Sequence, residues 1–85
     1  MNKQELPEWF TGTIYEIGEI VSNPFTGEKY ELNNLELSMY DFIMGSQMVM
    51  EISPKYVSER SISEFNKALK WFRETNPEAY KILLD

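Results

Sequence analysis

Residues 33–52 (NNLELSMYDFIMGSQMVMEI) constrain the fold of this chain more than any other stretch. If they form a helix, with about 100° between successive residues, apolar side chains lie on two nearly opposite sides. A helix with two apolar sides has to be covered twice. In a chain of 85 residues, we expect part of the second cover to come from another molecule. One stripe contains Leu35, Met39, Phe42, Ile43, Val49 and Met50, and the second, the methionine stripe, contains Leu37, Tyr40, Met44 and Met48.

The methionine stripe has two interpretations. It forms an adaptable binding surface, because the unbranched side chain of Met repacks easily. Alternatively, the rest of the chain covers it. We favour cover within one chain for most of the stripe, and we expect some of it to reach a subunit interface.

The residues before this helix predict a β-hairpin over 13–32. Residues 13–22 (TIYEIGEIVS) are rich in β-branched and aromatic residues, which favour strands, and Gly18 within them indicates a bulge or a bend. Residues 23–27 (NPFTG) have the composition of a turn, and residues 28–32 return as a second strand with Tyr30 and Leu32 inward. A hairpin of this size is not stable alone, so we expect it to pack on the helix.

The ends of the central helix carry recognisable signals. Asn33 and Glu36 have the spacing of a capping box, and Pro54 ends the helix near Ile52 and opens a further short turn. Gly45 lies in the middle of the helix, where a glycine lowers helix stability by about 1 kcal/mol relative to Ala. We interpret this glycine as a site of close approach by another backbone, with a kink as the alternative.

A C-terminal helical segment is expected over residues 61–85. Ser61 and Glu64 predict the start of one helix by a second capping box, and Asn76 followed by Pro77 predicts the cap of a last helix. The first of these helices has a single apolar stripe, made of Ile62, Phe65, Leu69 and Phe72.

Trp71 lies about 100° away from this apolar stripe, on the polar side of the helix. It is either covered by the next segment of the chain or offered to a partner. The candidate interface residues are therefore Leu37, Tyr40, Met44, Met48 and Trp71. Together the elements predict one compact α+β domain over residues 1–85, in which an N-terminal β-hairpin packs on a central helix and one or two helices follow.

The sequence contains no histidine and no cysteine. This removes the commonest general base, the usual catalytic triads and the usual zinc ligands. Catalysis would need carboxylates, Lys, Tyr or an oxygen-bound metal, and no EF-hand or P-loop spacing is present. We predict a protein that is not an enzyme and has no cofactor or metal site, with a weak Mg²⁺ or Ca²⁺ site on the acidic hairpin as the remaining option. The candidate carboxylates are Glu16, Glu19, Glu28, Glu31, Glu36 and Asp41.

The charge is concentrated in the first part of the chain. Residues 1–52 contain nine acidic and two basic residues, whereas residues 53–85 contain five acidic and six basic ones. This balance argues against binding nucleic acid, which requires a basic surface. No signal peptide or membrane span is apparent, so we expect a soluble, cytoplasmic protein with no membrane partner.

Three runs resemble small uncharacterised proteins encoded by marine tailed bacteriophages: NPFTGEKYELN (23–33), YDFIMG (40–45) and WFRETNPEAYKILLD (71–85). The resemblance covers roughly residues 14–85. It implies a phage setting and the cytoplasm of an infected bacterium, and it supplies no site residues because those proteins have no assigned activity.

Two functional hypotheses follow. The first is a non-enzymatic protein that acts by protein–protein contact, as a homo-oligomer or as an accessory to a larger phage or host machine. The alternative is an acidic inhibitor that mimics nucleic acid and blocks a host enzyme. The acidic first part of the chain motivates this alternative, although Tyr and Ile interrupt the carboxylates.

Overall fold

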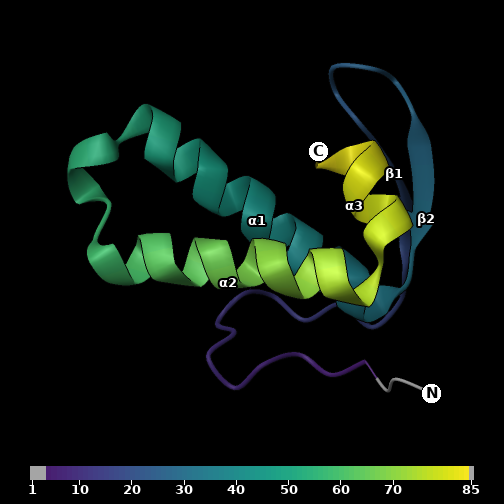
Figure 1. Ribbon diagram of the computed structural model, residues 1–85, viewed down its shortest axis with the longest axis horizontal. Coiled ribbons are helices and arrows are strands. Elements are labelled where there is room, and N and C mark those ends of the chain that lie inside the picture. The colour runs from purple at the N-terminus through teal and green to yellow at the C-terminus, as the bar shows by residue number, and fades with distance from the viewer. Residues whose placement is uncertain (1–3, 85) are drawn as a thin grey trace.

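An extended N-terminal segment leads into a β-hairpin and then into helices in the computed structural model, which describes residues 4–84 (Figure 1). Residues 1–3 and 85 of the predicted domain lie outside the described residues. The α+β class is confirmed, because an antiparallel two-stranded sheet precedes the helices. The elements in chain order are β1 (Glu19–Ser22), β2 (Lys29–Leu32), α1 (Asn34–Ile52), a short 3-10 helix η1 (Pro54–Tyr56), α2 (Glu59–Thr75) and α3 (Pro77–Leu83).

Helices α1 and α2 lie side by side and are joined through η1 at one end of the molecule, while the hairpin and α3 lie at the other end (Figure 1). The hydrophobic core therefore forms where the first half of α1 meets the second half of α2, with β2 and α3 closing it. Its fully buried members include Leu32, Met39, Ile43, Ala68, Phe72 and Ala79.

The N-terminus of α1 has the predicted capping box. The side chain of Asn33 accepts a hydrogen bond from the backbone N–H of Glu36 (2.8 Å), and the Glu36 carboxylate accepts one from the backbone N–H of Asn33 (3.0 Å). Because β2 ends at Leu32 and the cap follows at once, α1 starts immediately after the hairpin.

The first strand is shorter than the sequence predicts, since pairing begins at Glu19 and not at residue 13. Residues 13–18 have no partner strand, because β2 has already ended. They bind α1 through side chains instead: Ser38 Oγ accepts from the backbone N–H of Tyr15 (2.9 Å), and Asn34 Nδ2 donates to the Tyr15 carbonyl oxygen (3.3 Å). This segment therefore lies across the first half of α1.

Gly18 is located where this segment turns into β1. A Cβ atom at this position would overlap the carbonyl oxygen of Leu32 and lie 2.8 Å from Cα of Asn33. A glycine is thus required by close backbone approach, which accounts for the break in the strand pattern at this residue.

Helix α2 begins at Glu59, earlier than predicted. Ser58 is the N-cap, and its Oγ accepts a hydrogen bond from the backbone N–H of Ser61 (3.0 Å). Ser58 takes this role because it is the residue with extended backbone directly before the helical turns. The predicted cap of the last helix is confirmed, since the Asn76 side chain accepts from the backbone N–H of Ala79 (3.1 Å).

A buried carboxylate connects these elements. Glu36 is almost fully buried, and one of its oxygens accepts from Asn76 Nδ2 (3.0 Å) and from Gln4 Nε2 (2.9 Å). The same side chain is part of the α1 capping box, so the N-terminal segment, α1 and the cap of α3 meet at one group. Among residues 4–84, no helix is long and apolar enough to span a bilayer.

Candidate interaction surface

The structure divides the methionine stripe along its length. Leu37 and Tyr40 are buried in the chain's own core, where the Tyr40 ring lies 6.4 Å from that of Phe72. These two predicted interface residues are therefore core residues, because the hairpin, α2 and α3 cover the first half of α1. Met44 is partly buried, and Met48 is 59% exposed.

Trp71 lies beneath the N-terminal segment. Its indole N–H donates to the backbone carbonyl of Glu5 (2.9 Å), and its ring contacts Phe72 edge-on. Trp71 is thus covered within the chain, but by the N-terminal segment and not by the segment that follows it.

The N-terminal segment also covers one side of α1. Trp9 and Phe10 pack against Phe42, with ring centroids 5.9 and 5.4 Å away, and Tyr15 is bound to Ser38 further along. The second half of α1 has no such cover on this side. The helix therefore changes from a covered core helix to an exposed one near Gly45.

Large apolar side chains remain exposed at the end of the molecule where α1, η1 and α2 connect. They belong to the three consecutive elements α1, η1 and α2. We call this set the distal surface; its members and their exposed fractions are Met48 (59%), Val49 (51%), Ile52 (73%), Tyr56 (75%) and Ile62 (46%). Four further large apolar side chains are exposed elsewhere, on the N-terminal segment and the hairpin: Ile14, Ile17, Ile20 and Phe25.

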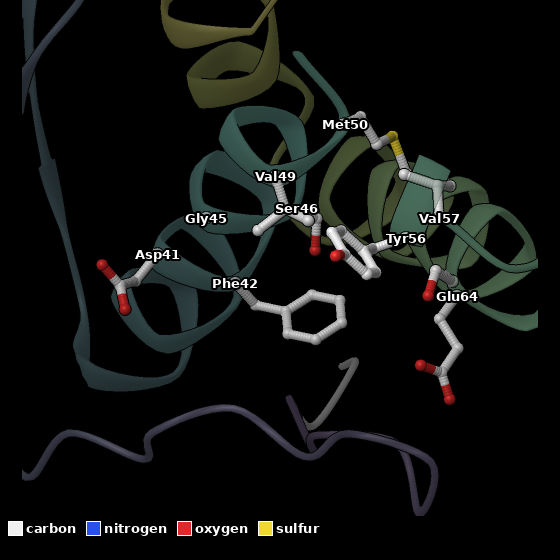
Figure 2. Close-up of a pocket in the computed structure, with 10 residues that line it drawn as sticks. Asp41, Phe42, Gly45, Ser46, Val49, Met50, Tyr56, Val57 and Glu64 are labelled. Atoms are coloured by element: carbon white, nitrogen blue, oxygen red, sulfur yellow. The ribbon is translucent and has the colours of Figure 1, made fainter. Parts of the chain in front are cut away.

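A groove of about 450 Å³ borders the distal surface, between the second half of α1 and the start of α2. Phe42 and Tyr56 both line this groove, and Figure 2 shows Asp41 and Glu64 at opposite sides of it. The groove thus has an apolar centre and acidic margins.

Gly45 lies at the edge of this groove and is exposed. A Cβ atom added there would meet no atom within 4 Å, and α1 is continuous from Asn34 to Ile52. The predicted close approach of another backbone does not occur within this chain. Nothing in the fold of one chain requires a glycine at this position.

Two tyrosines near the first half of α1 have altered acidity. Removal from water raises the pKa of Tyr40 above its ordinary value of 10.0. Removal from water also raises the pKa of Tyr15, and the negative charges of Asp41 and Glu19 act in the same direction. Both hydroxyls therefore hold their protons to a higher pH than an ordinary tyrosine does.

The acidic residues of the hairpin do not converge. Glu19 pairs with Leu32 and Ile20 pairs with Glu31, so Glu19 and Glu31 lie on opposite faces of the ribbon. Within residues 4–84, no group of three or more acidic side chains is arranged to hold a metal ion.

Sequence reasoning identified Met48 but missed most of the distal surface. It assigned Val49 and Ile62 to covered stripes and gave no role to Ile52 or Tyr56. The lengths of the helices carry the missing signal, since α1 has 19 residues and α2 has 17, more than a short hairpin and a seven-residue α3 can cover. No protein-family model, curated protein or solved structure matches the chain, so no relative supplies site residues.

Proposed function

We propose that this protein is a non-enzymatic assembly protein that associates with itself through the distal surface. The supporting observation is that five large apolar side chains of the consecutive elements α1, η1 and α2 are exposed, three of them on the second half of α1. Apolar patches of this kind on a small protein mark sites of protein contact. The resemblance to phage proteins adds a proposed setting, the cytoplasm of an infected bacterium.

The chemistry of the surface supports binding rather than catalysis. Its groove contains the carboxylates of Asp41 and Glu64 at opposite sides, and the sequence has no histidine or cysteine to act with them. Nucleic-acid mimicry has less support than self-association, because the hairpin carboxylates of Glu19 and Glu31 point to opposite faces and do not form one row.

Molar mass in solution tests the proposal. Size-exclusion chromatography with light scattering, from about 1 to 100 µM, is expected to show a mass above that of the 10.1 kDa chain, rising with concentration. Met48→Asp is expected to return the mass to that of a single chain, because it places an unpaired charge in the contact. A single-chain mass for the unmodified protein over the whole range would overturn self-association.

Gln47→Asp is the matched control. Gln47 is the neighbouring residue on α1 and is also exposed, but it lies about 100° away from Met48 around the helix. It should leave the mass unchanged. If Met48→Asp lowers the melting temperature at low concentration while the mass is unaffected, Met48 supports the fold of the single chain and not its assembly.

A further inference from the structure

We propose that two copies pair through the second half of α1 in an antiparallel, two-fold arrangement, with Ile52 of each copy placed over Gly45 of the other. This inference rests on the proposed self-association and adds the contact surface and its register. It follows from three properties of the exposed face of α1: its spacing, its shape and its charge.

The spacing places one continuous stripe along α1. Asp41, Gly45, Met48 and Ile52 follow one another at intervals of four, three and four residues, which puts them on the same side of a helix. All four are exposed, and Val49 beside them is half exposed. The N-terminal segment covers this side of the helix only up to Ser38 and Phe42.

The shape of the stripe is complementary to itself. Gly45 offers space, since no atom lies within 4 Å of its missing Cβ, and Ile52 offers a large side chain that is 73% exposed. The midpoint between them falls between Met48 and Val49. A two-fold axis at this midpoint places Ile52 of each copy over Gly45 of the other, so the same contact forms twice in the dimer. A single chain gives no other reason for the glycine.

The charges favour the antiparallel direction. In a parallel pair, Asp41 would face Asp41 and the bulky Ile52 would face Ile52, while Gly45 facing Gly45 would leave a void. In the antiparallel pair, Asp41 at one end of the stripe approaches Lys55 of the second copy, which follows the other end of α1. Opposite charges then meet at both margins of the contact.

The proposed contact has an apolar centre inside a polar rim, as standard interfaces do. The centre comes from three exposed side chains on the second half of α1: Met48, Val49 and Ile52. Asp41, Glu51 and Lys55 are exposed around it and supply the rim.

Engineered disulfides test the register, and the absence of native cysteine makes the test clean. Val49→Cys is expected to form a disulfide-linked dimer on mild oxidation, because the two copies of residue 49 lie next to the two-fold axis. Gly45→Cys mixed with Ile52→Cys, one of them carrying a tag that alters its mass, is expected to link across the two variants.

Gly45→Cys alone is the control. In the proposed pair, the two copies of residue 45 are separated along the helix by seven residues, about 10 Å. A disulfide requires Cα atoms within about 7 Å, so Gly45→Cys alone should not link to itself. A parallel pair would reverse the result, with residue 45 linking to residue 45 and no link between 45 and 52.

Gly45→Leu gives an independent readout. The added side chain meets open space in one chain but collides with Ile52 of the second copy. We expect the dissociation constant of the dimer to rise at least tenfold. At low concentration, the melting temperature of the single chain should be no lower than that of the unmodified protein. Unchanged association of Gly45→Leu would overturn the register.

The outcomes also separate this inference from the proposed function. A single-chain mass for the unmodified protein at 100 µM removes both. Suppose instead that the mass is that of a dimer, but that residue 45 forms a disulfide with residue 45 or that no disulfide forms at any of these positions. Self-association then stands, and the antiparallel α1 pair is overturned.

Discussion

At the scale of single residues, the fold of one chain accounts for Gly18 and gives no reason for Gly45. Gly18 lies where the backbone of residues 32 and 33 passes too close for any side chain. Gly45 lies in an exposed helical turn with free space around it. The two positions therefore predict opposite effects of the same substitution.

Gly45→Ala is expected to stabilise the single chain by about 1 kcal/mol, because Ala is the better helix former and the added methyl group meets nothing. Gly18→Ala is expected to destabilise it, since the methyl group would displace β2 from the start of α1. Thermal unfolding at concentrations too low for association measures both. Equal effects of the two substitutions would contradict the backbone arrangement at Gly18.

The two tyrosines predict a loss of stability in alkali. The folded-state pKa of Tyr40 is raised, so the folded protein holds this proton more tightly than the unfolded chain does. This contribution is complete below pH 10 and is lost as the pH rises through the folded-state pKa. The raised pKa of Tyr15 changes stability with pH in the same direction.

Denaturant unfolding between pH 8 and 11.5 should therefore show a decline in the free energy of unfolding above pH 10. Tyr40→Phe should make that decline shallower, because no proton is lost from residue 40. Tyr56→Phe is the control, since the ring of Tyr56 is 75% exposed and outside the core. An unchanged slope in Tyr40→Phe would contradict the prediction.

At the scale of elements, two helix caps of similar chemistry differ in their surroundings. Asn76 caps α3 and also donates to the buried Glu36 carboxylate, whereas Ser58 caps α2 in an exposed position. Loss of a cap costs about 1 kcal/mol, and loss of a donor to a buried charged group costs about 1–3 kcal/mol more. The two caps should not contribute equally.

Asn76→Ala is expected to lower the free energy of unfolding by about 2–4 kcal/mol, and Ser58→Ala by about 1 kcal/mol. Chemical denaturation at neutral pH measures both. If the two losses are equal, the hydrogen bond between Asn76 and Glu36 contributes nothing to stability.

The elements also show what the sequence could predict. Local signals sufficed for the capping box at Asn33, the turn before β2 and the cap at Asn76, because each depends on a few neighbouring residues. The start of β1 at Glu19 depends on where β2 stops, and the burial of Leu37 depends on what folds back over α1. Both features depend on segments that are distant in the sequence, so local periodicity does not predict them.

The candidate site was partly predictable for the same reason. Periodicity showed that α1 carries more apolar surface than one cover can hide, which identified Met48. It did not show that the N-terminal segment ends its cover near Phe42, so it could not separate the buried first half from the exposed second half. Trp71 needed the contact with Glu5, 66 residues away in the sequence.

At the scale of the whole molecule, the proposed self-association would link stability to concentration. A protein that pairs only when folded gains stability as its concentration rises. The melting temperature should increase by several degrees between about 1 and 100 µM, and Met48→Asp should remove this increase. A melting temperature that is independent of concentration in the unmodified protein would contradict the proposed pair.

The strands of the hairpin and α3 lie at the end of the molecule opposite the connection between α1 and α2 (Figure 1). In an antiparallel pair they would project in opposite directions, so the particle would resemble a dumbbell with two identical heads. Any ligand of one head would then be recognised at the other, which turns a small chain into a bridge between two like objects. Tethering of this kind strengthens weak contacts by avidity, without any additional bond at either head.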